Sequence, residues 1–138
     1  MNLPVVLVLD DAQAARERVR NALRSLSLRV QATDSWVDTK TAVFSASPPD
    51  LLVLDLQMPT IDGKAVGRAI KRRLDIPIVI FSSEEPAKIA AAVAEVGAEA
   101  GVSKSAPDSE LIATISRLLT RRAKAAAPAV MPAGGLLS

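Results

Sequence analysis

Three acidic residues follow two apolar segments that each have the length of a β-strand. Asp10 and Asp11 come directly after the run Val5–Leu9, and Asp55 comes directly after the run Leu51–Leu54. Carboxylates at the ends of hydrophobic strands are costly to bury unless they meet a cation. If the two runs are parallel strands, their carboxyl ends lie side by side at the edge where open α/β sheets place their sites. The three groups would then form an oxygen-rich pocket suited to Mg²⁺.

The composition excludes several other kinds of site. The 138-residue chain contains no Cys and no His, which removes thiolate nucleophiles, disulfides, Cys- or His-bound zinc and catalysis by a His base. Its formal net charge of +2 is modest and does not favour nucleic-acid binding. No apolar stretch approaches membrane-spanning length, and the N-terminus lacks the features of a signal peptide. We therefore expect a cytoplasmic protein without membrane insertion and without a nucleic-acid partner.

Apolar runs alternate with amphipathic segments along the chain, which has a 49% hydrophobic composition and can therefore form a substantial core. The predicted strands are 5–9, 28–32, 51–54, 78–81 and about 100–103. Amphipathic helices are predicted at about 15–26, from 34 or 35 to 44, at 64–73, at 86–97 and at 107–122. Strands that alternate with helices predict a parallel sheet covered by helices on both faces.

The character of the chain changes after Arg122. Residues 123–138 are rich in Ala, Pro and Gly and show no hydrophobic period. Such a composition is typical of a disordered tail. We therefore expect one domain over residues 1–122 and a disordered tail over residues 123–138.

Several short motifs fall at the ends of the predicted strands. In chain order they are Leu-Asp-Asp at 9–11, Asp-Leu-Gln-Met-Pro at 55–59 with Asp62-Gly63, Ile-Phe-Ser-Ser at 80–83, Val-Gly-Ala at 96–98, and Lys104. In this order and spacing, the chain resembles the receiver domains of bacterial two-component response regulators over roughly residues 3–122. The resemblance implies a flavodoxin-like, doubly wound (βα)5 fold with a five-stranded parallel sheet in the order 2-1-3-4-5.

The resemblance also implies how the acidic cluster works. Asp55 would be the phosphoacceptor and would form an acyl phosphate. Asp10 and Asp11 would hold Mg²⁺ together with Asp55 and the backbone carbonyl of Gln57. The residues alone leave another interpretation open for Asp10 or Asp11, because either carboxylate could cap the following helix.

Two further residues gain a role from the resemblance. Ser82 would hydrogen-bond one oxygen of the phosphoryl group, and Lys104 would pair with another. Considered alone, Ser82 could be a helix-capping serine, and Lys104 could be a solvated surface lysine. The position of Lys104 after the fifth predicted strand favours the site role.

Two positions depart from the usual pattern of the family. Receivers usually carry Tyr or Phe where this chain has Gly101, and Pro where it has Ser105. Without a ring at Gly101, the usual inward swing of an aromatic side chain cannot operate. We expect the region around the 86–97 helix and the fifth strand to be mobile before phosphorylation, or a partner's side chain to fill the gap. We expect a trans bond between Lys104 and Ser105, because a cis bond before a residue other than proline costs about 2.5–4 kcal/mol.

These observations predict a single-domain response regulator with an atypical switch. It would accept its phosphoryl group from a sensor histidine kinase or a phosphotransfer protein. Its only catalysis would be self-phosphorylation and autodephosphorylation, so it would not be a conventional enzyme. Its output would be a protein contact through the predicted 86–97 helix, 100–103 strand and 107–122 helix.

Other classes of function fit the sequence less well. A pseudo-receiver, an interaction module that works independently of phosphorylation, is favoured by Gly101 but not by the intact acidic cluster. A phosphohydrolase of the haloacid-dehalogenase type would carry a second Asp two residues after the nucleophile, where this chain has Gln57. A flavodoxin-like electron carrier would need aromatic residues to stack on a flavin, and the chain has two Phe, one Trp and no Tyr.

Overall fold

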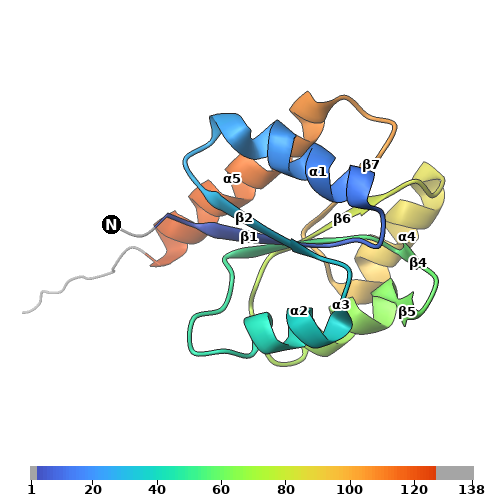
Figure 1. Cartoon of the computed structure of the whole chain (residues 1–138), viewed down its shortest axis with the longest axis horizontal. Helices are drawn as coiled ribbons and strands as arrows, with labels where there is room; N and C mark the ends of the chain where they lie inside the picture. The colour runs from blue at the N-terminus through green and yellow to red at the C-terminus, as the bar shows by residue number, and fades with distance from the viewer. Residues whose placement is uncertain (1–2, 127–138) are drawn as a thin grey trace, which may run out of the picture.

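Five parallel strands form the central sheet of the protein (Figure 1). The computed structural model describes residues 3–126. The strands are β1 (Val5–Leu9), β2 (Arg29–Thr33), β3 (Leu51–Leu54), β6 (Ile78–Ser82) and β7 (Ala100–Ser103). Their spatial order is β2-β1-β3-β6-β7, which confirms the predicted order 2-1-3-4-5. Every residue of β3 and β6 is buried, as expected for central strands covered on both faces.

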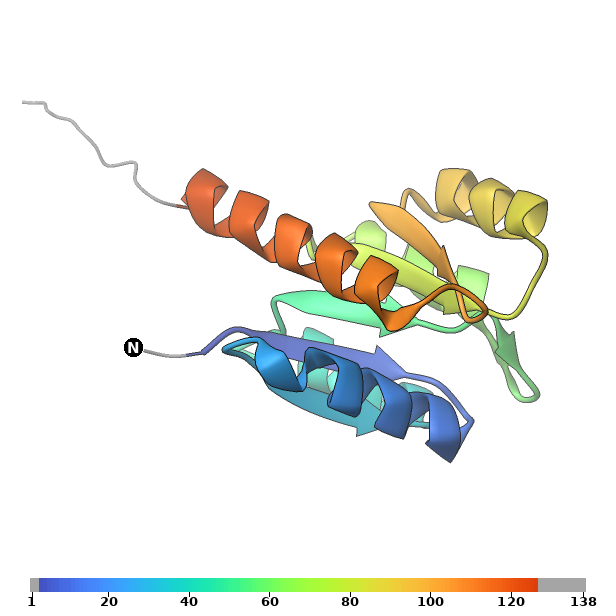
Figure 2. The same cartoon turned by 90° about the horizontal axis from the view of Figure 1, so that it is seen from above.

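Five α-helices cover the sheet, and they divide between its two faces (Figures 1 and 2). They are α1 (Gln13–Ala22), α2 (Trp36–Val43), α3 (Gly63–Lys71), α4 (Pro86–Val96) and α5 (Asp108–Ala126). Helices α1 and α5 pack together on one face, where Val19, Leu111 and Ile115 meet the strands. Helices α2, α3 and α4 contribute to a second hydrophobic cluster on the other face. The result is the doubly wound α/β architecture predicted from the alternating pattern.

Two helix ends differ by four residues from the sequence-based prediction, and the other helix bounds differ by at most two. Helix α1 ends at Ala22 and continues as a 3-10 turn over Leu23–Ser25, instead of running on to Leu26. Helix α5 continues to Ala126, four residues past the predicted end at Arg122. Alanine and lysine are strong helix formers, so residues 123–126 extend the helix instead of belonging to a disordered tail. The rest of the predicted tail, residues 127–138, lies outside the described residues.

A small hairpin follows the third strand of the sheet, in a region that includes the predicted turn at 59–63. Strand β4 (Gln57–Met58) pairs antiparallel with strand β5 (Ile61–Asp62). Asp62 then caps α3, because its side chain accepts hydrogen bonds from the amides of Lys64 and Ala65. The hairpin thus leads the chain from the end of β3 directly into the next helix.

Helix α4 lies directly on β7 at Gly101. A Cβ atom at this position would come within 2.5 Å of Ile89 Cγ2 and 2.9 Å of Val93 Cγ2. The space next to Gly101 is therefore taken by two side chains of α4. The expected gap that a partner would fill does not exist. No cis peptide bond occurs in the described part of the chain, so the bond between Lys104 and Ser105 is trans as predicted.

Candidate functional site

The acidic cluster lies at the carboxyl edge of the sheet, where β1 and β3 end next to each other. The register pairs Leu9 with Leu54, so the next residues, Asp10 and Asp55, leave the sheet together. One carboxylate oxygen from each of Asp10, Asp11 and Asp55 lies within 4.8 Å of the others. The convergence expected from two adjacent parallel strands is therefore present.

Two of the three carboxylates are buried. Asp10 and Asp55 are each 2% exposed, whereas Asp11 is exposed. Oδ1 of Asp10 accepts a hydrogen bond of 2.9 Å from the amide of Ala12, just before α1 begins. The N-cap of α1 is nevertheless Ala12, and no side chain caps this helix, so the interpretation of Asp10 or Asp11 as a helix cap is wrong. The second oxygen of Asp10, Oδ2, lies in the cluster, 2.8 Å from Nζ of Lys104.

Lys104 supplies the positive charge of the site. Its Nζ lies 2.8 Å from Oδ2 of Asp10 and 3.6 Å from Oδ1 of Asp55. Its backbone amide donates a hydrogen bond of 2.8 Å to the carbonyl oxygen of Ser82, directly after β7 ends. With a side chain that is only 17% exposed, Lys104 is part of the cluster and not a solvated surface residue.

The environment of Asp55 opposes its ionisation. Burial raises the pKa of the Asp55 carboxyl, and the nearby charge of Asp10 raises it further, while the Lys104 charge and the Gln57 amide act in the opposite direction. Oδ1 of Asp55 is buried and has no hydrogen-bond partner in the described structure. A buried acceptor without a partner carries its full desolvation penalty. The site therefore holds a carboxylate whose charge would be stabilised by an additional cation.

Known proteins match the chain at the level of sequence and fold. Residues 6–116 match the family model described as the response regulator receiver domain. The chain belongs to this family. A curated relative is the response regulator MprA of Mycobacterium avium (strain 104), 32% identical over 117 residues that make up 84% of this chain and 51% of the relative. Another is the probable transcriptional regulator ycf27 of Porphyridium aerugineum, 28% identical over 96% of this chain and 55% of the relative. The receiver thus spans about half the length of these relatives.

Solved structures share the fold. The signal receiver domain of an HD domain-containing protein from Pseudomonas fluorescens Pf-5 superimposes with a TM-score of 0.80 at 19% identity, covering 91% of this chain and 93% of that one. A CheY-like receiver domain protein from Methanospirillum hungatei JF-1 gives a TM-score of 0.76 at 18% identity, covering 90% of this chain and 99% of that one. These similarities agree with the strand order of the receiver described above.

Ser82 and Gln57 flank the acidic cluster of the receiver. Ser82 is the last residue of β6 and is fully buried, and its Oγ accepts a hydrogen bond of 3.1 Å from the amide of Glu84. Ser82 does not cap α4, since the N-cap of that helix is Glu85. Gln57 is exposed on β4, and its amide acts on the pKa of Asp55, which places its backbone beside that carboxylate.

One residue near the site has no signal in the sequence. The helical period of the predicted 15–26 helix indicates that Arg18 faces mainly solvent, as do Arg16, Arg20 and Arg24. In the structure the guanidinium group of Arg18 donates hydrogen bonds to the carbonyl oxygens of Lys104 and Ala106. A helical pattern shows which face a residue occupies, but not that a long side chain reaches a loop 86 residues later.

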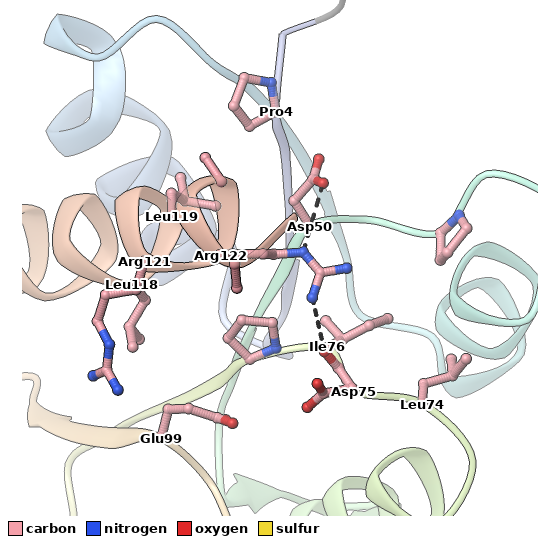
Figure 3. A pocket seen from close by; sticks show the side chains of 14 residues that line it. Pro4, Asp50, Leu74, Asp75, Ile76, Glu99, Leu118, Leu119, Arg121 and Arg122 are labelled. Atoms are coloured by element: carbon pink, nitrogen blue, oxygen red, sulfur yellow. Dashed lines mark hydrogen bonds and ion pairs between the residues drawn. The ribbon is translucent and has the colours of Figure 1, made fainter. Parts of the chain in front are cut away.

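The receiver also contains a cavity of about 770 Å³ at the opposite edge of the sheet (Figure 3). Its lining includes Pro4, Asp50 and Pro77, which precede β1, β3 and β6. Arg122 of α5 crosses it and donates a hydrogen bond of 2.7 Å to the carbonyl oxygen of Asp75. No member of the acidic cluster lines this cavity, so it is separate from the site.

Among residues 3–126, no helix is long and apolar enough to cross a membrane.

Proposed function

We propose that this receiver accepts a phosphoryl group on Asp55 and signals by changing its protein contacts. The observation that carries the proposal concerns Oδ1 of Asp55. This atom is buried, lacks a hydrogen-bond partner among residues 3–126 and lies 3.6 Å from Nζ of Lys104. A carboxylate held in this way is not stabilised for a structural role. It stands instead among the charged groups that a phosphoryl acceptor needs.

The donor set around Asp55 fits Mg²⁺. Asp10, Asp11 and Asp55 offer hard oxygen ligands whose atoms lie within 4.8 Å of one another, and such ligands suit this cation. The backbone carbonyl of Gln57 would provide a further oxygen. When bound, Mg²⁺ would neutralise charge that otherwise repels an anionic phosphodonor from the carboxylates.

The proposed reaction is a nucleophilic displacement at phosphorus. An oxygen of Asp55 forms the new bond to phosphorus, and the bond between phosphorus and the donor's leaving group breaks, with its electron pair staying on the leaving group. Lys104 would move its ammonium group from Asp10 to one phosphoryl oxygen, since lysine is a point charge on a flexible stem. The hydroxyl group of Ser82 would donate a hydrogen bond to another phosphoryl oxygen. The donor would be a sensor histidine kinase or a phosphotransfer protein, acting in the cytoplasm.

The proposed output differs from the usual one because Gly101 has no side chain to rotate. Ile89 and Val93 contact the position that a Cβ atom of residue 101 would occupy, so α4 and β7 are coupled by helix packing. We propose that phosphorylation changes the packing of α4 against β7. The surface of α4, β7 and α5 would carry that change to a downstream protein.

Mass spectrometry of the intact protein tests the phosphoacceptor. Wild-type protein incubated with acetyl phosphate and Mg²⁺ should gain the mass of one phosphoryl group, and the gain should disappear with EDTA. Asp55→Asn should show no gain, whereas Asp50→Asn, which changes an Asp at the other edge of the sheet, should behave like wild type. Equal labelling of wild type and Asp55→Asn would exclude Asp55 as the acceptor.

A second candidate function is a pseudo-receiver that binds partners regardless of phosphorylation. The tight contact of Ile89 and Val93 with Gly101 favours it, because this contact leaves no cavity for a moving ring. Hydrogen exchange with and without beryllofluoride and Mg²⁺ distinguishes the two functions. A change in α4 and β7 supports the phosphorylation switch, and identical exchange in a protein that binds beryllofluoride supports the pseudo-receiver.

A further inference from the structure

The loop between β7 and α5 carries Lys104 and is held from outside by one side chain of α1. The Nε atom of Arg18 donates a hydrogen bond of 2.9 Å to Oδ1 of Asp108, and Nη2 donates one of 2.8 Å to the carbonyl oxygen of Ala106. The remaining nitrogen, Nη1, donates to the carbonyl oxygen of Lys104 itself. All three nitrogens of the guanidinium group are therefore used on this loop and on Asp108, the first residue of α5, an arrangement that only the fork of arginine allows.

The same guanidinium group also lies over a buried aromatic ring. Cζ of Arg18 is 5.2 Å from the centroid of the Phe81 ring, and Nζ of Lys104 is 5.9 Å from that centroid. Phe81 is 1% exposed and stands one residue before Ser82 on β6. Cations at this distance from a ring are attracted to its face. The ring of Phe81 thus lies close to both Arg18 and the ammonium group of Lys104.

The loop is a short turn where Lys104 leaves the sheet, and one backbone hydrogen bond of 3.0 Å, from the amide of Ala106 to the carbonyl oxygen of Ser103, spans it. Ser105 has no ring to fix its backbone angle, and its amide and hydroxyl bond only to the hydroxyl of Ser103. The carbonyl of Lys104 is bound to Arg18, a residue 86 positions earlier in the chain. The position of the lysine backbone therefore depends on α1 as well as on β7.

We propose that Arg18 is a positioning residue that holds Lys104 where its ammonium group meets the phosphoryl group. This inference rests on the proposed function, because it assigns Lys104 to the phosphoryl group and not to the metal. The proposal predicts different effects on the affinity for a phosphoryl analogue and on the affinity for Mg²⁺. Loss of Arg18 should weaken binding of a phosphoryl analogue that Lys104 contacts. It should not weaken binding of Mg²⁺, because Lys104 pairs with Asp10 and Asp55 and therefore competes with the metal for these carboxylates.

The test measures both affinities in the whole protein. Beryllofluoride binding is measured at saturating Mg²⁺, and Mg²⁺ binding is measured alone, by titration calorimetry or NMR. Arg18→Ala should weaken beryllofluoride binding about tenfold, as expected for the loss of a few charge-assisted hydrogen bonds, and leave Mg²⁺ binding no weaker. Arg18→Lys keeps the charge without the fork, and its loss should be intermediate.

Arg20→Ala is the matched control. Arg20 lies on the same helix and donates a hydrogen bond of 2.9 Å to the carbonyl oxygen of Val30 on β2, away from the Lys104 loop. Its replacement should change neither affinity. A second control uses Lys104→Ala as the background, where Arg18→Ala should cause no further loss of beryllofluoride binding, since the group that Arg18 positions is absent.

Several outcomes would overturn the assignment. Arg18→Ala and Arg20→Ala giving the same beryllofluoride affinity would remove any special role for Arg18. A parallel fall in Mg²⁺ and beryllofluoride affinity, or an undiminished effect in the Lys104→Ala background, would mean a general structural role. Failure of the proposed function looks different, because wild type would then bind beryllofluoride no better than Asp55→Asn does.

Discussion

Replacement of Gly101 by alanine should destabilise the protein, although alanine is usually preferred to glycine within a strand. The added Cβ would lie 2.5 Å from Ile89 Cγ2 and 2.9 Å from Val93 Cγ2. Carbon atoms pack best at roughly 3.5–4.0 Å, so α4 would have to move by about 1 Å. Side-chain rotation gives little relief, because isoleucine and valine are stiff at χ1.

The magnitude follows from two opposing effects. Overpacking a core contact costs about 1–3 kcal/mol. Reduced freedom of the unfolded chain returns about 0.4–1 kcal/mol when glycine becomes alanine. We therefore expect Gly101→Ala to lower the free energy of unfolding by about 1–2 kcal/mol. Urea denaturation followed by circular dichroism measures this difference, with an unchanged denaturant slope.

A double-mutant cycle tests the cause. Ile89→Ala removes the nearer methyl group, so Gly101→Ala should cost at least about 1 kcal/mol less in that background. Val96→Ala is the control, because Val96 lies on α4 but contacts the Gly67 position instead. The cost of Gly101→Ala should persist there. A Gly101→Ala protein as stable as wild type would refute the close seating of α4 on β7.

Three other predictions concern the acidic site. Burial raises the pKa of the Asp55 carboxyl, so its ionisation destabilises the folded state. The stability of the metal-free protein should fall as the pH rises from the ordinary pKa of Asp through the raised pKa of Asp55 in the folded state. Asp55→Asn without metal should therefore melt at a higher temperature than wild type at neutral pH, but not at a pH below the ordinary pKa of Asp. Mg²⁺ should raise the melting temperature of wild type. Asp11→Asn, a change at the exposed carboxylate of the proposed metal site, should weaken Mg²⁺ binding at least tenfold and so reduce this rise, without destabilising the metal-free protein. Gln57→Leu and Glu84→Leu should each slow decay of the phosphorylated protein severalfold without preventing its formation. The mass of the intact protein, measured over time, follows this decay. Decay at the wild-type rate in both variants would show that neither residue guides the hydrolytic water.

The central strands and the acidic cluster were predictable because local sequence determines them. Val5–Leu9 and Leu51–Leu54 are uninterrupted apolar runs that end at carboxylates, and the structure begins and ends both strands at these residues. Once both are parallel neighbours, Asp10 and Asp55 have to meet. Lys104 was assigned to the site by the resemblance to receiver domains, and its position after a strand of the same sheet supported that role.

The remaining features depend on contacts between distant segments, and no local pattern encodes them. The space above Gly101 was expected to be open, but Ile89 and Val93 occupy it, because helix packing can close over a missing side chain. Arg18 was expected to face solvent, but its long stem carries the guanidinium group to the Lys104 loop. The extension of α5 to Ala126 was not predicted, because the overall composition of residues 123–138 indicates a tail, whereas the helix propensity of residues 123–126 favours a helix.

The placement of the site's single lysine has a consequence for folding. Asp10, Asp11 and Asp55 all lie in the first half of the chain, whereas Lys104 follows the last strand. During synthesis the carboxylates are therefore made before the cation that neutralises them, and their mutual repulsion opposes the pairing of β1 with β3 at this edge. The complete chain reduces that repulsion when the loop docks against α1 through Arg18 and brings Lys104 to the carboxylates. Docking of the segment that carries Lys104 should accordingly be a late step of folding, which follows the pairing of β1 with β3. Mg²⁺ present during folding should favour the early pairing of these two strands.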